Sequence, residues 1–136
     1  MLFRSANQLW RVFSNLIENS LKHNPHGIML TVDAAVTTPG QSLFGLDLEQ
    51  AIGGARPNRP MLLCVVCDSG IGIAPEQAQR LFEPYTRGSQ ARYMPGLGLG
   101  LYLCKQIITA HGGDIGVDSR PQEGTTFWFT LPIHET

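Results

Sequence analysis

The sequence predicts a single α/β domain, because helix and strand patterns alternate along its 136 residues. Residues 5–23 place apolar side chains at helical spacing on one stripe. Residues 61–67 (MLLCVVC) form an apolar run that is typical of a buried strand. Residues 115–118 and 126–131 have strand patterns joined by a turn, which predicts a hairpin that closes the domain.

Composition excludes several classes of function. The net charge is −1, from ten basic and eleven acidic residues, so no electrostatic footprint for nucleic acid is present. The chain contains no signal peptide and no run of about eighteen apolar residues. We therefore expect a cytoplasmic domain without direct membrane contact. This leaves open that it is the cytoplasmic part of a membrane-bound sensor.

The three cysteines predict neither a disulfide framework nor a redox site. Cys64 and Cys67 have C-x-x-C spacing, but they lie inside a strand pattern, where residues three apart point to opposite faces. Zinc would require further ligands, and the four histidines are scattered. We interpret Cys64 and Cys67 as buried structural residues.

The first helix has an apolar stripe and a polar face. The stripe consists of Leu9, Val12, Phe13, Leu16, Ile17 and Leu21, and the opposite face of Arg11, Asn15, Glu18, Asn19 and Lys22. Two interpretations of the polar face are open. It is a solvated surface with a Glu18–Lys22 ion pair, or its two asparagine oxygens hold Mg²⁺ while phosphates complete the coordination. In the second case Lys22 neutralises phosphate charge.

The motif DSGIGI at residues 68–73 follows the buried strand directly. A buried carboxylate at the end of a strand is costly unless it is paired or functional. The glycines allow a sharp turn and the close approach of a flat ligand. The sequence therefore predicts that Asp68 binds an adenine ring, with the Thr125 hydroxyl close by.

The connections between these elements carry further predictions. Residues 28–36 read as a strand and residues 75–82 as a short helix, whereas residues 37–60 form a long inserted loop. That loop is either a surface segment with a short helix near residues 46–52 or a partner-docking surface. Residues 89–95 are polar and patternless, which predicts a flap that is disordered without nucleotide. Arg87 and Arg92 could reach an anion there, although Arg92 fits a solvated loop equally well.

The glycine-rich segment GLGLGL at residues 96–101 precedes a helix that we expect to end at His111. Glycines before a helix leave its first N–H groups accessible, which favours phosphate binding. The spacing matches neither a Walker loop nor a Rossmann fingerprint.

Five motifs in order resemble those of one family. They are residues 15–23 (NLIENSLKH), 68–73 (DSGIGI), 82–85 (FEPY), 96–101 (GLGLGL) and 124–127 (GTTF). They resemble the N box, first glycine box, F box, second glycine box and last glycine box of the catalytic ATP-binding domain of bacterial two-component sensor histidine kinases. This family belongs to the wider gyrase, Hsp90, histidine kinase and MutL superfamily. Tyr85 stands where a second phenylalanine is common, and residues 37–60 lie outside the resemblance.

The resemblance implies a fold and a set of ligand contacts. The fold is a two-layer α/β sandwich of the Bergerat type, with a mixed sheet of about five strands, three helices on one face, and an ATP lid at residues 86–97. Asn19 is the implied Mg²⁺ ligand. The implied nucleotide-binding residues are Asn15, Asn19, Lys22, Asp68, Gly70, Gly72, Ile73, Phe82, Arg87, Gly96, Leu97, Gly98, Leu99, Gly100, Leu101 and Thr125.

The resemblance also implies phosphoryl transfer rather than hydrolysis. Hydrolysing members of the superfamily carry a glutamate four residues before the metal asparagine, and Asn15 occupies that position here. An asparagine cannot act as a base. The implied catalytic residues are Glu18, which would polarise an incoming histidine, together with Asn15 and Arg87.

The expected partners are a phosphoacceptor dimerisation domain of the same kinase, which is absent from this chain, and a downstream response regulator. The isolated domain is then expected to be monomeric and unable to phosphorylate itself. Two alternatives remain: a nucleotide-binding module without catalysis, and an anti-sigma-type serine protein kinase of the same superfamily.

Overall fold

The computed structural model describes residues 6–24, 27–37, 42–43, 46–47, 60–83, 97–120 and 123–133. In chain order the elements are α1 (Ala6–His23), β1 (Leu30–Thr37), β2 (Ser42–Leu43), β3 (Leu46–Asp47), β4 (Met61–Asp68), α3 (Pro75–Arg80), α5 (Leu97–Ala110), β5 (Ile115–Arg120) and β6 (Gly124–Pro132). Among these helices, none is long and apolar enough to span a membrane.

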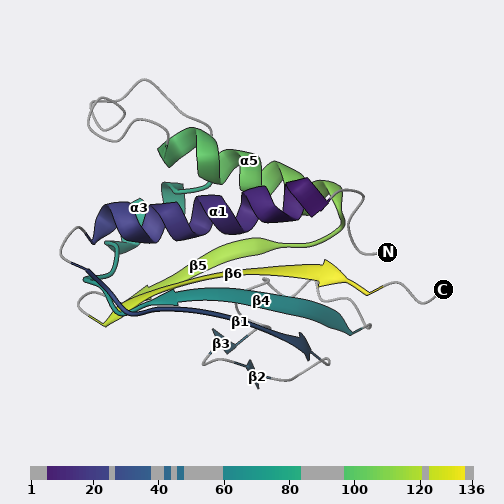
Figure 1. The fold of residues 1–136 in the computed structure, drawn as a ribbon, viewed down its shortest axis with the longest axis horizontal. Coiled ribbons are helices and arrows are strands. Elements are labelled where there is room, and N and C mark those ends of the chain that lie inside the picture. Colours follow the sequence, from purple (N-terminus) through teal and green to yellow (C-terminus); the bar gives the residue numbers. More distant parts are fainter. Residues whose placement is uncertain are drawn as a thin grey trace.

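The domain has two layers, as predicted. The main sheet has the order β1-β4-β6-β5, and α1, α3 and α5 cover one of its faces (Figure 1). The described part of this sheet has four strands rather than about five, and all three neighbouring pairs are antiparallel rather than mixed. In the antiparallel pairing of β1 with β4, Thr37 at the end of β1 lies opposite Met61 at the start of β4. The chain therefore returns at the same end of the sheet that it left.

Strand β4 lies between β1 and β6, which explains its unbroken apolar run. Cys64 and Val66 belong to the core cluster under the helices. Leu63 and Val65 pack with Trp128 in a second cluster, against which Cys67 also packs. A strand alternates its side chains between the two faces of a sheet, so a central strand whose side chains are buried on both faces is apolar throughout. Cys64 is buried as predicted, whereas Cys67 is only half-buried; the two point to opposite faces, and all three cysteines are free thiols.

Helix α1 confirms most of the predicted stripe but not all of it. Val12 and Leu16 are fully buried, and Phe13 contacts Phe129 edge-to-face with ring centroids 5.2 Å apart. Leu21, however, is 51% exposed, whereas Asn19 on the predicted polar face is only 1% exposed. At about 100° per residue, Asn19 lies roughly 60° around the helix from Leu16 and Leu21 roughly 140°. The polar residue therefore falls within the buried arc and the leucine outside it.

The remaining element boundaries differ slightly from the predictions. The strand expected at residues 28–36 runs over Leu30–Thr37, and the short helix ends at Arg80. The prediction of a short helix near residues 46–52 is wrong at its first two residues, because Leu46 and Asp47 lie in β3, which pairs antiparallel with β2. Residues 38–41, 44–45 and 48–59 of the inserted loop and the flap at residues 89–95 lie outside the described residues.

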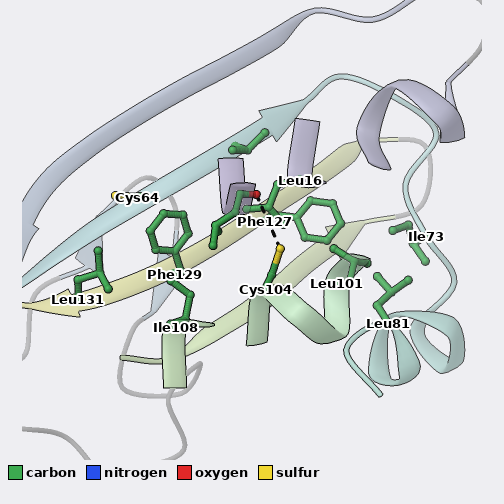
Figure 2. Close-up of a cluster of buried hydrophobic side chains, with 12 residues drawn as sticks. Leu16, Cys64, Ile73, Leu81, Leu101, Cys104, Ile108, Phe127, Phe129 and Leu131 are labelled. Atoms are coloured by element: carbon green, nitrogen blue, oxygen red, sulfur yellow. Dashed lines mark hydrogen bonds between the residues drawn. The ribbon is translucent and has the colours of Figure 1, made fainter. Parts of the chain in front are cut away.

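Helices α1 and α5 are joined through Cys104 in the middle of the core. The Cys104 thiol points at the main-chain oxygen of Val12 across 3.8 Å, the contact drawn as a dashed line in Figure 2. Leu16, Leu101 and Phe127 lie around it. Burial raises the pKa of the Cys104 thiol from 9.0 to about 11, so this residue is a neutral packing group.

Candidate functional site

Asp68 ends β4 and is 9% exposed, as the sequence predicts for an acid at the end of a buried strand. One carboxylate oxygen, Oδ1, accepts a hydrogen bond from the main-chain N–H of Gly70 at 2.9 Å. This bond folds the first glycine box back over the carboxylate. It uses one oxygen of the carboxylate, which has acceptor capacity left for a ligand.

Thr125 lies next to Asp68, as predicted. The two residues are directly opposite each other in the antiparallel pairing of β4 with β6. The Thr125 hydroxyl lies 3.1 Å from the hydroxyl of Ser119, and Ser119 Oγ accepts a hydrogen bond from the N–H of Ile73 at 2.6 Å. A chain of hydroxyls therefore ties the far end of the glycine box to β5 and β6.

Gly124 permits this close packing of the last glycine box against the first. Its φ is +117°, a backbone conformation that residues with a side chain rarely adopt. A Cβ on Gly124 would also collide with the main-chain oxygen of Asp68. The glycine lets β6 begin directly against the end of β4.

Asn19 has the most unusual environment on α1. Its side chain is buried, and neither the oxygen nor the nitrogen of its amide has a hydrogen-bond partner within the described part of the chain. A buried polar group without a partner is unfavourable by about 1–3 kcal/mol. Such a group calls for an explanation, and a bound ligand is one. The solvated-face interpretation is therefore wrong for Asn19.

Asn15 lies one turn earlier and faces α5. Its amide nitrogen donates to the main-chain oxygen of Gly100 at 3.3 Å and lies 3.6 Å from the sulfur of Cys104. The N box is thereby attached to the second glycine box. Glu18 and Lys22 are both exposed on the outer side of α1.

The second glycine box does not precede α5 but forms its first turn, because the helix begins at Leu97. The first four N–H groups of a helix lack partners inside the helix, so Leu97, Gly98, Leu99 and Gly100 still supply the donors that the phosphate hypothesis needs. Leu101 is buried in the core. Arg87 and Gly96 lie outside the described residues.

Phe82 of the F box packs on the core. Its ring meets Phe127 edge-to-face, with centroids 6.3 Å apart at an angle of 84°. This contact attaches the segment after α3 to β6. The nucleotide-binding role of Phe82 stays a prediction.

Sequence reasoning missed two residues of this site, Asn24 and Ser119. Asn24 lies just beyond the apolar stripe of the first helix, yet its side-chain oxygen accepts a hydrogen bond from the N–H of Ile71 in the first glycine box at 3.2 Å. Ser119 lay just beyond the expected strand, yet it bonds Ile73. Both contacts join segments more than forty residues apart, with a separation of 47 residues for the first pair of positions and 46 for the second. No local pattern signals them.

Comparison with known proteins agrees with this site. Residues 4–135 match the family described as histidine kinase-, DNA gyrase B- and HSP90-like ATPase. The chain is 33% identical to the sensor protein EvgS of Escherichia coli K12 over 90% of its length, and 34% identical to the sensor histidine kinase WalK of Bacillus subtilis over 95%. It spans only 9% and 18% of those two proteins.

Solved structures show the same fold. The mycobacterial sensor histidine kinase MprB superposes with a TM-score of 0.67 at 29% identity, covering 96% of this chain and 76% of that one. Full-length ShkA, solved in complex with AMPPNP, shares the fold with a TM-score of 0.60 at 23% identity, covering 95% of this chain and 22% of that one. This chain is therefore an ATP-binding domain of the histidine kinase-, DNA gyrase B- and HSP90-like ATPase family, of the type found in sensor histidine kinases.

Proposed function

We propose that this domain binds Mg²⁺-ATP and transfers the γ-phosphoryl group to a histidine on a separate phosphoacceptor dimerisation domain. The observation that carries the proposal is the buried, unpartnered amide of Asn19 on α1. An amide oxygen is a suitable Mg²⁺ ligand, and this ion commonly takes one or two protein ligands together with phosphate oxygens and waters. When bound, the ion neutralises phosphate charge.

The described residues fit an adenine nucleotide in complementary ways. Asp68 would accept a hydrogen bond from the exocyclic amine of adenine, with the Thr125 hydroxyl beside it. The first-turn N–H groups of α5 would bind phosphate oxygens, and Asn19 would hold the metal. Lys22 is exposed near the end of the same helix, where its ammonium could neutralise phosphate charge. The phosphate contact proposed for Arg87 rests on the sequence alone, because Arg87 lies outside the described residues.

Asn15 supports transfer rather than hydrolysis. It occupies the position from which a glutamate would activate water in the hydrolysing branch of the superfamily, and its amide nitrogen is engaged by the Gly100 oxygen. An amide does not accept a proton near neutral pH. Glu18, exposed on the outer side of α1, is the proposed residue that polarises the incoming histidine.

The relatives bear on the proposed biological context. EvgS and WalK are named sensor proteins, and the chain spans a small part of each. We infer a cytoplasmic catalytic domain within a longer two-component kinase, with a response regulator downstream.

The test is nucleotide titration with and without Mg²⁺, followed by incubation of the domain and γ-labelled ATP with the phosphoacceptor domain of the full-length kinase. We expect Mg²⁺-dependent ATP binding and label on the acceptor that is lost in acid, as a phosphohistidine is. Acid-stable label would indicate a serine kinase instead. Binding without transfer would indicate a non-catalytic module, and release of free phosphate would indicate a hydrolase.

A further inference from the structure

The side chain of Asn24 links the end of α1 to the loop that follows β4. Its amide nitrogen donates to the main-chain oxygen of Ser20 at 2.8 Å, and its amide oxygen accepts from the N–H of Ile71 at 3.2 Å. The first bond occupies a carbonyl of the last helical turn, where carbonyls lack partners inside the helix. Both bonds together require a donor and an acceptor on one short planar group, which asparagine provides.

Gly70 lies directly against this amide. A Cβ on Gly70 would overlap Asn24, whose Cγ, Oδ1 and Nδ2 are the three nearest atoms. Gly70 is not one of the glycines with positive φ, so its backbone conformation is open to other residues. We therefore attribute the need for glycine at this position to the space that the Asn24 amide fills.

The two segments that Asn24 joins are the two halves of the candidate site. Ser20 is the neighbour of Asn19 on α1, and Ile71 follows Gly70, whose N–H is bonded to Asp68. Ser69 ties the same loop to Met29 before β1, and Ile73 ties it to Ser119 on β5. Among the described residues, it is Asn24 whose hydrogen bonds attach the loop to α1.

We propose that Asn24 is a positioning residue that holds Asn19 and Asp68 at the separation needed by a ligand spanning both. The inference rests on the proposed function, because the ligand is Mg²⁺-ATP. Such a ligand requires α1 and the loop to be in place at the same time. If the link is lost, only a fraction of molecules is competent, and the apparent affinity falls by that fraction. A ligand that contacts the Asp68 half alone does not need the link.

The experiment compares adenosine with ATP, each with and without Mg²⁺, in the wild-type domain and in Asn24→Ala, using calorimetry for ATP and amide chemical shifts for adenosine. We expect Mg²⁺-ATP affinity to fall about tenfold in the variant, and adenosine affinity to stay within about twofold. The matched control is Thr130→Val, which removes the bond from the N–H of Asp114 to the Thr130 hydroxyl at 3.1 Å. Thr130 lies five residues along β6 from Thr125, about 16 Å away, and its loss should leave both affinities unchanged.

A second variant tests the same contact from the other side. Gly70→Ala should displace the Asn24 amide and lower Mg²⁺-ATP affinity, and it should cost less affinity in the Asn24→Ala background, where the colliding atoms are gone.

Strict additivity of the two substitutions would overturn the proposal. So would an equal loss of adenosine and Mg²⁺-ATP affinity, or no loss of either, in a wild-type protein that binds Mg²⁺-ATP. If the wild type does not bind Mg²⁺-ATP, the proposed function itself fails. If Asn24→Ala does not fold, the split between adenosine and Mg²⁺-ATP in Gly70→Ala decides the question.

Discussion

Asp68 and Thr125 are direct partners in the antiparallel pairing of β4 with β6. The carboxylate and the hydroxyl therefore lie side by side across the two strands, at the end of the sheet where the first and last glycine boxes meet. The Asp68 oxygen Oδ1 is bonded to Gly70, and the Thr125 hydroxyl contacts Ser119. Each side chain is held by a bond inside the protein before any ligand arrives, which lowers the cost of ordering the site on binding.

Asp68→Asn should weaken ATP binding by roughly 1.5–3 kcal/mol, or about ten- to hundredfold, because a bond to a charged group is lost. The asparagine oxygen can still accept from Gly70, so the loop should keep its conformation. Calorimetric titration with ATP measures the effect. Asp33→Asn is the matched control, since exposed Asp33 also accepts a nearby main-chain N–H, from Ala34 at 2.8 Å. Equal ATP affinity in the wild type and Asp68→Asn would refute the adenine assignment.

Asn19→Ala should remove the Mg²⁺-dependent increase in ATP affinity, because the amide oxygen proposed to hold the metal is gone. Titrations with and without Mg²⁺ measure this increase. Ser20→Ala is a close control, since the Ser20 hydroxyl is equally buried at 1% exposure and has no partner in the described part of the chain. That variant should keep its response to Mg²⁺. An Asn19→Ala domain that still responds to Mg²⁺ would exclude Asn19 as the ligand.

Asn19→Leu should stabilise the nucleotide-free domain while abolishing the response to Mg²⁺. A leucine has the same number of side-chain heavy atoms and the same branch point, and it would occupy this buried position without two unpartnered polar atoms, whose burial is unfavourable by about 1–3 kcal/mol. Urea unfolding should therefore give a free energy of unfolding that is higher by at least about 1 kcal/mol. A lower value would show that the amide is satisfied in the free protein and that no ligand is needed to explain it.

The buried thiols predict a loss of stability at alkaline pH. Burial raises the pKa of Cys64 and of Cys104 from 9.0 to about 11. A group whose pKa is raised in the folded state stabilises fully below its unfolded pKa, and the contribution disappears as the pH rises through the folded pKa. The free energy of unfolding should therefore decrease between about pH 9 and pH 11. Replacing both residues with valine should flatten this decrease in urea titrations, and an unchanged slope would contradict the assignment.

Much of the fold and the site could be predicted from local patterns. The helical spacing of Leu9, Val12 and Leu16 predicts α1, and the apolar run before Asp68 predicts β4, because both patterns report burial along one element. The glycine boxes were recognisable because turns and first helical turns need particular residues at fixed positions.

Other features depend on how the elements pack. The burial of Asn19 and the exposure of Leu21 follow from the angle at which α1 lies on the sheet, which periodicity fixes only approximately. The short strand at Leu46 and Asp47 requires a partner strand, so the residues themselves do not reveal it. The antiparallel main sheet is likewise a consequence of which strands meet.

The sequence by itself determined the ligand class and the family, since the acid, the two asparagines and the glycines occur in short motifs whose chemistry is local. The tertiary structure decided which residues hold those motifs together. Asn24 contacts Ile71, and Ser119 contacts Ile73, across more than forty residues of chain. Such contacts form only after the helix layer has packed on the sheet, because hydrogen bonds between distant segments depend on the fold that brings them within about 3 Å.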